Sequence, residues 1–104
     1  GKTVVALLCM LLAADNGFQS CLMAPTEILA TQHYQSIAAL LNGTGLEIGL
    51  LTGSTRVRER RILHEKLQSG TLHFLVGTHA LIEPEVKFQN LGLTIIDEQH
   101  RFGV

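Results

Sequence analysis

The chain has 104 residues, a formal net charge of −1 and 46% apolar residues. This length suits one domain or a piece of one, and the apolar fraction excludes an intrinsically disordered chain. A charge near zero also excludes a strongly basic protein that binds nucleic acid over its whole surface, so any such contact must come from local groups. Two cysteines, Cys9 and Cys21, argue against a disulfide or metal framework, and we expect both to be buried, reduced thiols.

The first part of the chain predicts a helix, a strand and a second helix. An almost wholly apolar run predicts a helix over 3–14 without a polar face, which other elements should cover on most sides. The run is too short to span a bilayer, so we expect no membrane association. Asp15-Asn16-Gly17 should end this helix, and a strand over 19–24 follows. Pro25 ends the strand, and Thr26 should cap a helix that runs to residue 41.

The second part predicts a helix over 56–68 and three strands, over 46–51, 72–76 and 93–96. Hydroxyls in the loop 52–55 are placed to cap the helix. One helical turn through residue 82 and a brief pairing at 86–88 are further expectations. Strands that alternate with helices are typical of βαβ units around a mainly parallel sheet, so we expect residues 1–104 to form one partial α/β domain.

Polar or glycine-containing loops follow each predicted strand, at 25–27, 52–54, 77–79 and 97–100. The carboxyl ends of parallel strands share one edge of the sheet, and ligands of open α/β sheets bind along that edge. These loops should therefore lie together, which is stronger evidence for a site than any single motif.

The two ends of the chain carry complementary signals for a nucleotide site. Gly1-Lys2-Thr3 matches the end of a phosphate-binding loop, in which the Lys reaches the phosphates and the Thr hydroxyl binds Mg²⁺. Asp97 follows a buried strand and suits the same Mg²⁺, while Glu98 suits a base that orients or deprotonates a water. The alternatives are a solvated lysine at one end and a helix cap with an acid in its first turn at the other.

Other polar groups are less specific. The cluster Arg56, Arg58, Arg60 and Arg61 is expected to form a solvated helix face. His33, His64 and His73 are expected to be structural, and His79 lies on the functional edge. The five histidines have no spacing typical of metal ligands. Loop hydroxyls beside Gly or Pro suit contacts to a sugar-phosphate backbone or, alternatively, ordinary helix capping.

In order along the chain, five segments resemble the successive motifs of superfamily 2 helicases, and more narrowly of the RecG-type ATP-dependent DNA helicases. They are Gly1-Lys2-Thr3, Met23-Ala24-Pro25-Thr26-Glu27-Ile28-Leu29-Ala30, Leu51-Thr52-Gly53-Ser54, Val76-Gly77-Thr78-His79-Ala80-Leu81-Ile82 and Ile96-Asp97-Glu98-Gln99-His100-Arg101-Phe102-Gly103-Val104. The resemblance covers the whole chain. The translocase module of transcription-repair coupling factors is the nearest alternative, although that family more often has Glu at the position of Gln99.

The resemblance implies a three-layer RecA-like P-loop NTPase domain, truncated because its first strand and glycines do not precede Gly1. It implies a bacterial, cytoplasmic enzyme that uses ATP and Mg²⁺ to remodel branched DNA such as stalled forks and Holliday junctions. A second RecA-like domain and a wedge domain would be partners in the same protein.

The resemblance also implies residue roles. Gly1, Lys2 and Thr3 bind nucleotide, Thr3 and Asp97 bind the metal, and the catalytic group is Glu98, with Gln99 and His100 coupling hydrolysis to movement. The residues near the DNA backbone are Ala24, Pro25, Thr26, Gly53, Gly77 and Thr78. A non-enzymatic α/β domain that binds nucleotide or protein remains the alternative from another class.

Overall fold

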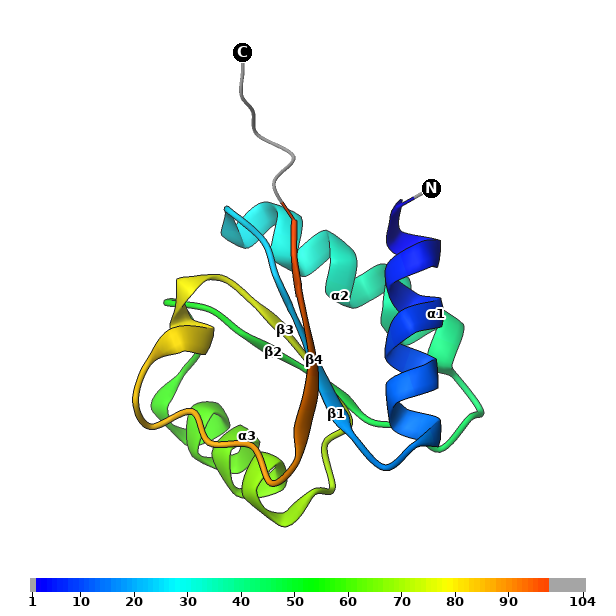
Figure 1. Cartoon of the computed structure of the whole chain (residues 1–104). Helices are drawn as coiled ribbons and strands as arrows, with labels where there is room; N and C mark the ends of the chain where they lie inside the picture. The colour runs from blue at the N-terminus through cyan, green and yellow to red at the C-terminus, as the bar shows by residue number, and fades with distance from the viewer. Residues whose placement is uncertain (1, 98–104) are drawn as a thin grey trace.

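The computed structural model of the protein describes the backbone of residues 2–97 and the side chains of residues 4–97 (Figure 1). Strands and helices alternate along the chain, as the sequence predicts. The elements are α1 (Lys2–Asp15), β1 (Gln19–Met23), α2 (Glu27–Leu41), β2 (Ile48–Leu51), α3 (Val57–Ser69), β3 (Phe74–Gly77), the 3₁₀ helix η1 (His79–Ile82) and β4 (Leu91–Ile96).

The four strands form one sheet in the order β2-β3-β1-β4, and every neighbouring pair is parallel. The parallel α/β fold expected from the sequence is therefore confirmed. The strand β4 begins two residues earlier than predicted, because Leu91 pairs with Gln19 before a shift in register. The expected pairing at 86–88 is wrong, since this segment is not in a strand.

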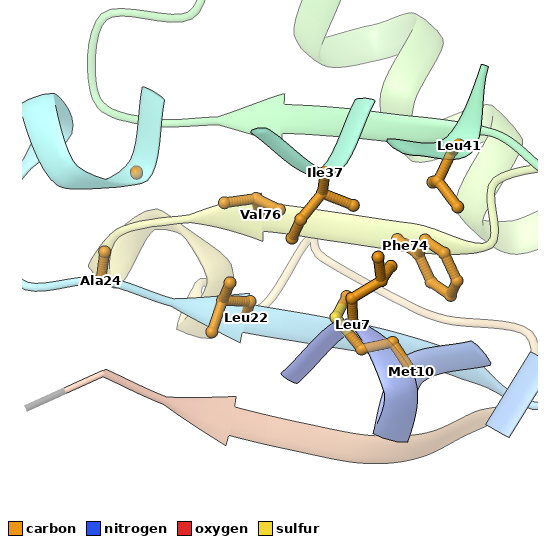
Figure 2. Packing of buried hydrophobic residues seen from close by; sticks show 9 residues of the cluster. Leu7, Met10, Leu22, Ala24, Ile37, Leu41, Phe74 and Val76 are labelled. Carbon is orange, nitrogen blue, oxygen red and sulfur yellow. The ribbon is translucent and has the colours of Figure 1, made fainter. Parts of the chain in front are cut away.

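One face of the sheet packs against α1 and α2 (Figure 2). Side chains alternate between the faces along a strand, so Leu22 of β1 and Phe74 and Val76 of β3 share this face. Leu7 and Met10 of α1 and Ile37 and Leu41 of α2 pack against them to form a continuous buried core.

The opposite face packs against α3 and η1. Cys21, Leu51 and Leu75 alternate onto this face and pack against Leu67 of α3 and Leu81 of η1. The sheet thus lies between two helical layers, which is the expected three-layer arrangement (Figure 1).

The predicted end of α1 is confirmed, whereas the predicted cap of α3 is wrong. Gly17 and Gly70 end α1 and α3 in the left-handed region, with φ of 85° and 82°. The cap predicted for α3 is wrong, because the helix begins one residue later than expected and its N-cap is Arg56, which makes no side-chain cap. The Thr55 hydroxyl instead accepts a hydrogen bond from Thr52 N at 2.9 Å and closes the loop before the helix.

The helix α1 is covered on one side only, contrary to expectation. Its outward face leaves Val4, Val5, Leu8 and Leu12 at least half exposed, and no element of residues 2–97 packs over them. Cys9 lies on this exposed face, so its predicted burial is wrong. No helix in the described part of the chain is long and apolar enough to cross a membrane.

Cys21 is a buried, free thiol, as expected. Burial raises the pKa of this thiol, and its hydrogen bond with Thr94 opposes that rise. A raised pKa favours the neutral thiol over the nucleophilic thiolate.

Candidate nucleotide and nucleic-acid site

The loops that carry the candidate residues meet at one edge of the sheet. All four strands are parallel, so Ala24, Thr52, Thr78 and Asp97 each follow a strand at the same edge. Backbone hydrogen bonds tie these loops together, from Ala24 N to Gly77 O at 2.8 Å and from Asp97 N to Met23 O at 2.8 Å. This common placement is the arrangement expected from the sequence.

The N-terminus of α1 lies at the same edge. A short turn connects α1 to β1, so the helix runs antiparallel to the strands and begins near their carboxyl ends (Figure 1). Its sheet-facing side packs beside β1 and β4. The backbone of Lys2 therefore lies at the edge where Asp97 follows β4, and a helix N-terminus favours anions such as phosphates.

The Asp97 carboxylate has a partner that sequence reasoning missed. His33 Nε2 lies 2.7 Å from Asp97 Oδ2, and the two side chains are 15% and 11% exposed. A deprotonated carboxylate only accepts hydrogen bonds, so the imidazole donates through Nε2–H. His33 was expected to be structural, whereas it contacts the proposed metal ligand.

A signal for this role was present in the spacing of α2. Ala30, Ile37 and Leu41 form the buried stripe of the helix, and His33 falls on the same stripe, three residues after Ala30. The helix begins at the loop edge of the sheet, so a residue in its second turn remains close to that edge. The spacing alone does not identify Asp97, which is 64 residues away.

The loops at this edge of the sheet also form an open pocket of about 370 Å³. Four of the residues assigned to the DNA backbone line it, namely Pro25, Thr26, Gly53 and Thr78. These residues come from the loops after β1, β2 and β3. The structure therefore brings together residues that are up to 53 positions apart.

Hydrogen bonds from side chains connect the loops around this pocket. Ser54 Oγ donates to Glu27 Oε1 at 2.6 Å, which joins the loop after β2 to the start of α2. Arg60 donates to Thr52 O at 3.1 Å and to Glu83 Oε1 at 3.0 Å. Arg60 is thus a bridge between two loops and not part of a solvated face, while Arg56, Arg58 and Arg61 are exposed as expected.

The other two residues assigned to the DNA backbone are buried. Ala24 is 2% exposed and packs in the core. A Cβ atom on Gly77 would clash with the carbonyl oxygen of Leu51, so Gly77 allows β3 and β2 to approach closely. Neither residue lines the pocket.

Several candidate residues lie outside the described part. Gly1, Glu98, Gln99 and His100 are not described, nor are the side chains of Lys2 and Thr3. Within the described residues, no cluster of three or more His, Cys, Asp or Glu side chains could hold a metal ion. Asp97 is therefore the one predicted metal ligand whose side chain the structure describes.

The profile of the DEAD/DEAH box helicase family matches residues 1–104. The chain belongs to this family. Members of the DEAD/DEAH box helicase family bind nucleotide, which agrees with the phosphate-loop ending at one end of the chain and the acidic strand end at the other.

Individual relatives give a more specific comparison than the family does. It is 56% identical over 104 residues to the ATP-dependent DNA helicase RecG of Synechocystis sp., covering 100% of this chain and 12% of that protein. It is also 56% identical to RecG of Staphylococcus aureus, of which it covers 15%. The structure of RecG bound to a three-way DNA junction matches with a TM-score of 0.88 and 46% identity, over 99% of this chain and 14% of that chain.

The chain therefore spans between 12% and 15% of the length of these RecG proteins. At 46% identity and this TM-score, its fold is that of the corresponding part of RecG, a RecA-like α/β domain. The expected fold and family resemblance are thus confirmed.

Proposed function

We propose that this chain is part of the ATP-binding motor domain of an ATP-dependent DNA helicase that remodels branched DNA, including stalled replication forks and Holliday junctions. One observation carries the proposal: the start of α1, Asp97 and the pocket around Thr26 share one edge of a parallel sheet. The similarity to RecG, and to a RecG structure bound to a three-way DNA junction, supports the DNA class.

The nucleotide end of this edge is assigned to Gly1, Lys2 and Thr3. The Lys ammonium would contact ATP phosphates, with help from backbone amides at the start of α1. The oxygen donors of Thr3 and Asp97 fit Mg²⁺, which prefers hard oxygen ligands and keeps several waters. Bound there, Mg²⁺ would neutralise charge on the phosphates.

The catalytic role is assigned to Glu98, the next residue after Asp97. A carboxylate at this position would hold an attacking water and accept its proton, which is the main chemical demand of phosphoryl transfer beyond positioning. Gln99 and His100 would couple the state of the nucleotide to movement of the motor.

The DNA end of the edge is assigned to the pocket around Thr26, Gly53 and Thr78. Loop hydroxyls and backbone amides suit sugar-phosphate contacts, which fix position without reading sequence. Unwinding would need a second RecA-like domain and a wedge domain in the rest of the protein. The proposed action on DNA implies a cytoplasmic location, as the resemblance does.

The test is ATP hydrolysis by the full-length protein, with and without three-way junction DNA. Junction DNA should stimulate the wild type, and Lys2→Ala should reduce stimulated turnover roughly a hundredfold or more, because a charge at the phosphates is lost. The matched control is Lys87→Ala, which removes an exposed lysine from the loop before β4. Equal turnover in the two variants, or no hydrolysis by the wild type, would overturn the proposal.

A further inference from the structure

The His33–Asp97 contact joins two side chains that are 64 positions apart in the sequence. Its 2.7 Å distance is typical of a hydrogen bond to a charged group, and both side chains are largely withdrawn from water. A contact of this kind fixes the torsion angles of both side chains. It therefore needs an explanation beyond the chance meeting of two surface groups.

The position of His33 is held by the core. It lies on the sheet-facing stripe of α2 between Ala30 and Ile37, both of which are fully buried. The start of the helix is fixed in turn by the Thr26 cap, whose Oγ1 accepts a hydrogen bond from Leu29 N at 3.2 Å. His33 thus presents its Nε2–H from a rigid helix and not from a loop.

The position of Asp97 is only partly fixed by its own strand. Its backbone N–H donates to Met23 O at 2.8 Å, which continues the ladder between β1 and β4. That bond sets the place of the Cα atom but leaves the side-chain torsions open. The contact to His33 restricts them, and a carboxylate with about four lone-pair sites can accept this bond and bind a metal as well.

We propose that His33 is a positioning residue that orients the Asp97 carboxylate toward the metal of the nucleotide site. This inference rests on the proposed function and adds His33 to the residues assigned to it above. Partners that hydrogen-bond to a metal ligand typically change metal affinity or activity by about 10- to 100-fold when they are removed.

The experiment measures Mn²⁺ binding in the presence of ADP by electron paramagnetic resonance, using the full-length protein. His33→Leu keeps the side chain's volume and removes the donor, so Mn²⁺ affinity should fall about 10- to 100-fold. His33→Gln places an amide N–H near the position of Nε2, and it should restore affinity to within a few-fold of wild type. The half-saturating Mg²⁺ concentration for ATP hydrolysis should follow the same order, with turnover largely recovered at high Mg²⁺.

The matched control is His64→Leu. His64 is a half-buried histidine of α3, on the opposite face of the sheet. This variant should bind Mn²⁺ as the wild type does. Junction binding without nucleotide checks that each variant is folded, and if His33→Leu fails this check, the inference is decided by His33→Gln alone.

Three results would overturn the inference. The first is an unchanged Mn²⁺ affinity in His33→Leu, and the second is a higher affinity in this variant, which would mean that His33 competes with the metal. The third is a loss of Mn²⁺ affinity in His33→Gln that is as large as in His33→Leu. Asp97→Asn separates this inference from the proposed function. If Asp97→Asn does not weaken Mn²⁺ binding, the assignment of the metal itself fails. If it does and His33→Leu does not, only the positioning role fails.

Discussion

At the scale of single residues, buried polar side chains determine how the loops are joined. Gln19 is 4% exposed, and its Nε2 donates to Leu67 O at 3.0 Å and to Leu72 O at 2.7 Å. Its Oε1 accepts from Asn90 N at 2.8 Å. One side chain thus joins the end of α3 to the segments that lead into β3 and β4.

Replacing Gln19 should therefore loosen the sheet. Gln19→Leu keeps similar volume but leaves Leu72 O and Asn90 N without this partner, which should cost about 2–4 kcal/mol of local stability. Hydrogen exchange of the β1 and β3 amides in the full-length protein measures this as a smaller opening free energy. Gln68→Leu, which alters an exposed residue of α3, is the control. Equal exchange in both variants would contradict the assigned role.

Residues of this kind mark the limit of prediction from sequence. The spacing of apolar residues places Gln19 in a strand and His33 on a helix face, and both placements are correct. The partners lie 48 to 71 positions away, and only the packing of the sheet brings them together. Buried polar groups require partners, but spacing does not say which.

At the scale of elements, α2 connects the two halves of the candidate site. Thr26, at its N-cap, lines the pocket assigned to DNA, and His33, two turns later, holds Asp97. The cap was predictable, because Thr follows Pro25 directly before an apolar helix. The missing cap of α3 was not, since Thr55 could bond either to the helix or to its own loop.

Thr26 thus has two roles that a pair of substitutions can test. Thr26→Ala should destabilise the first turn of α2 by about 1 kcal/mol, because Leu29 N loses its acceptor. It should also weaken junction-DNA binding without nucleotide, whereas Thr26→Ser should preserve both properties. Hydrogen exchange at Leu29 and fluorescence anisotropy with labelled junction DNA are the measurements. A Thr26→Ala protein that matches Thr26→Ser in both would refute these roles.

At the scale of the whole molecule, the described residues form a sheet between two helical layers, and the outer face of α1 in one of these layers is left exposed. The outer face of α1 is apolar and exposed, and Leu91 and Ile96 of β4, the edge strand that packs beside this helix, are also exposed. Exposed apolar surface of this extent is typical of an interface. We expected α1 to be covered because its sequence has no polar face. The helicases that this chain resembles are far longer than it is.

We propose that the chain is part of an ATP-driven motor in which two adjacent acids have different roles. Asp97→Asn should weaken nucleotide binding and hydrolysis together, because a metal ligand is lost. Glu98→Gln keeps shape and hydrogen bonding but removes the proton acceptor, so nucleotide should still bind. Glu65→Gln, an exposed acid of α3, is the control and should behave as the wild type does.

The most direct measurement is the rate of ATP-dependent unwinding of a three-way junction by full-length Glu98→Gln, with Mg-ATP affinity measured on the same sample. We expect ATP to bind within a few-fold of wild type while turnover and unwinding fall together by roughly two to four decades, the usual scale of a general base. Unwinding at the wild-type rate by the Glu98→Gln protein would contradict the assignment of this acid and, with unchanged hydrolysis in Asp97→Asn, the motor itself.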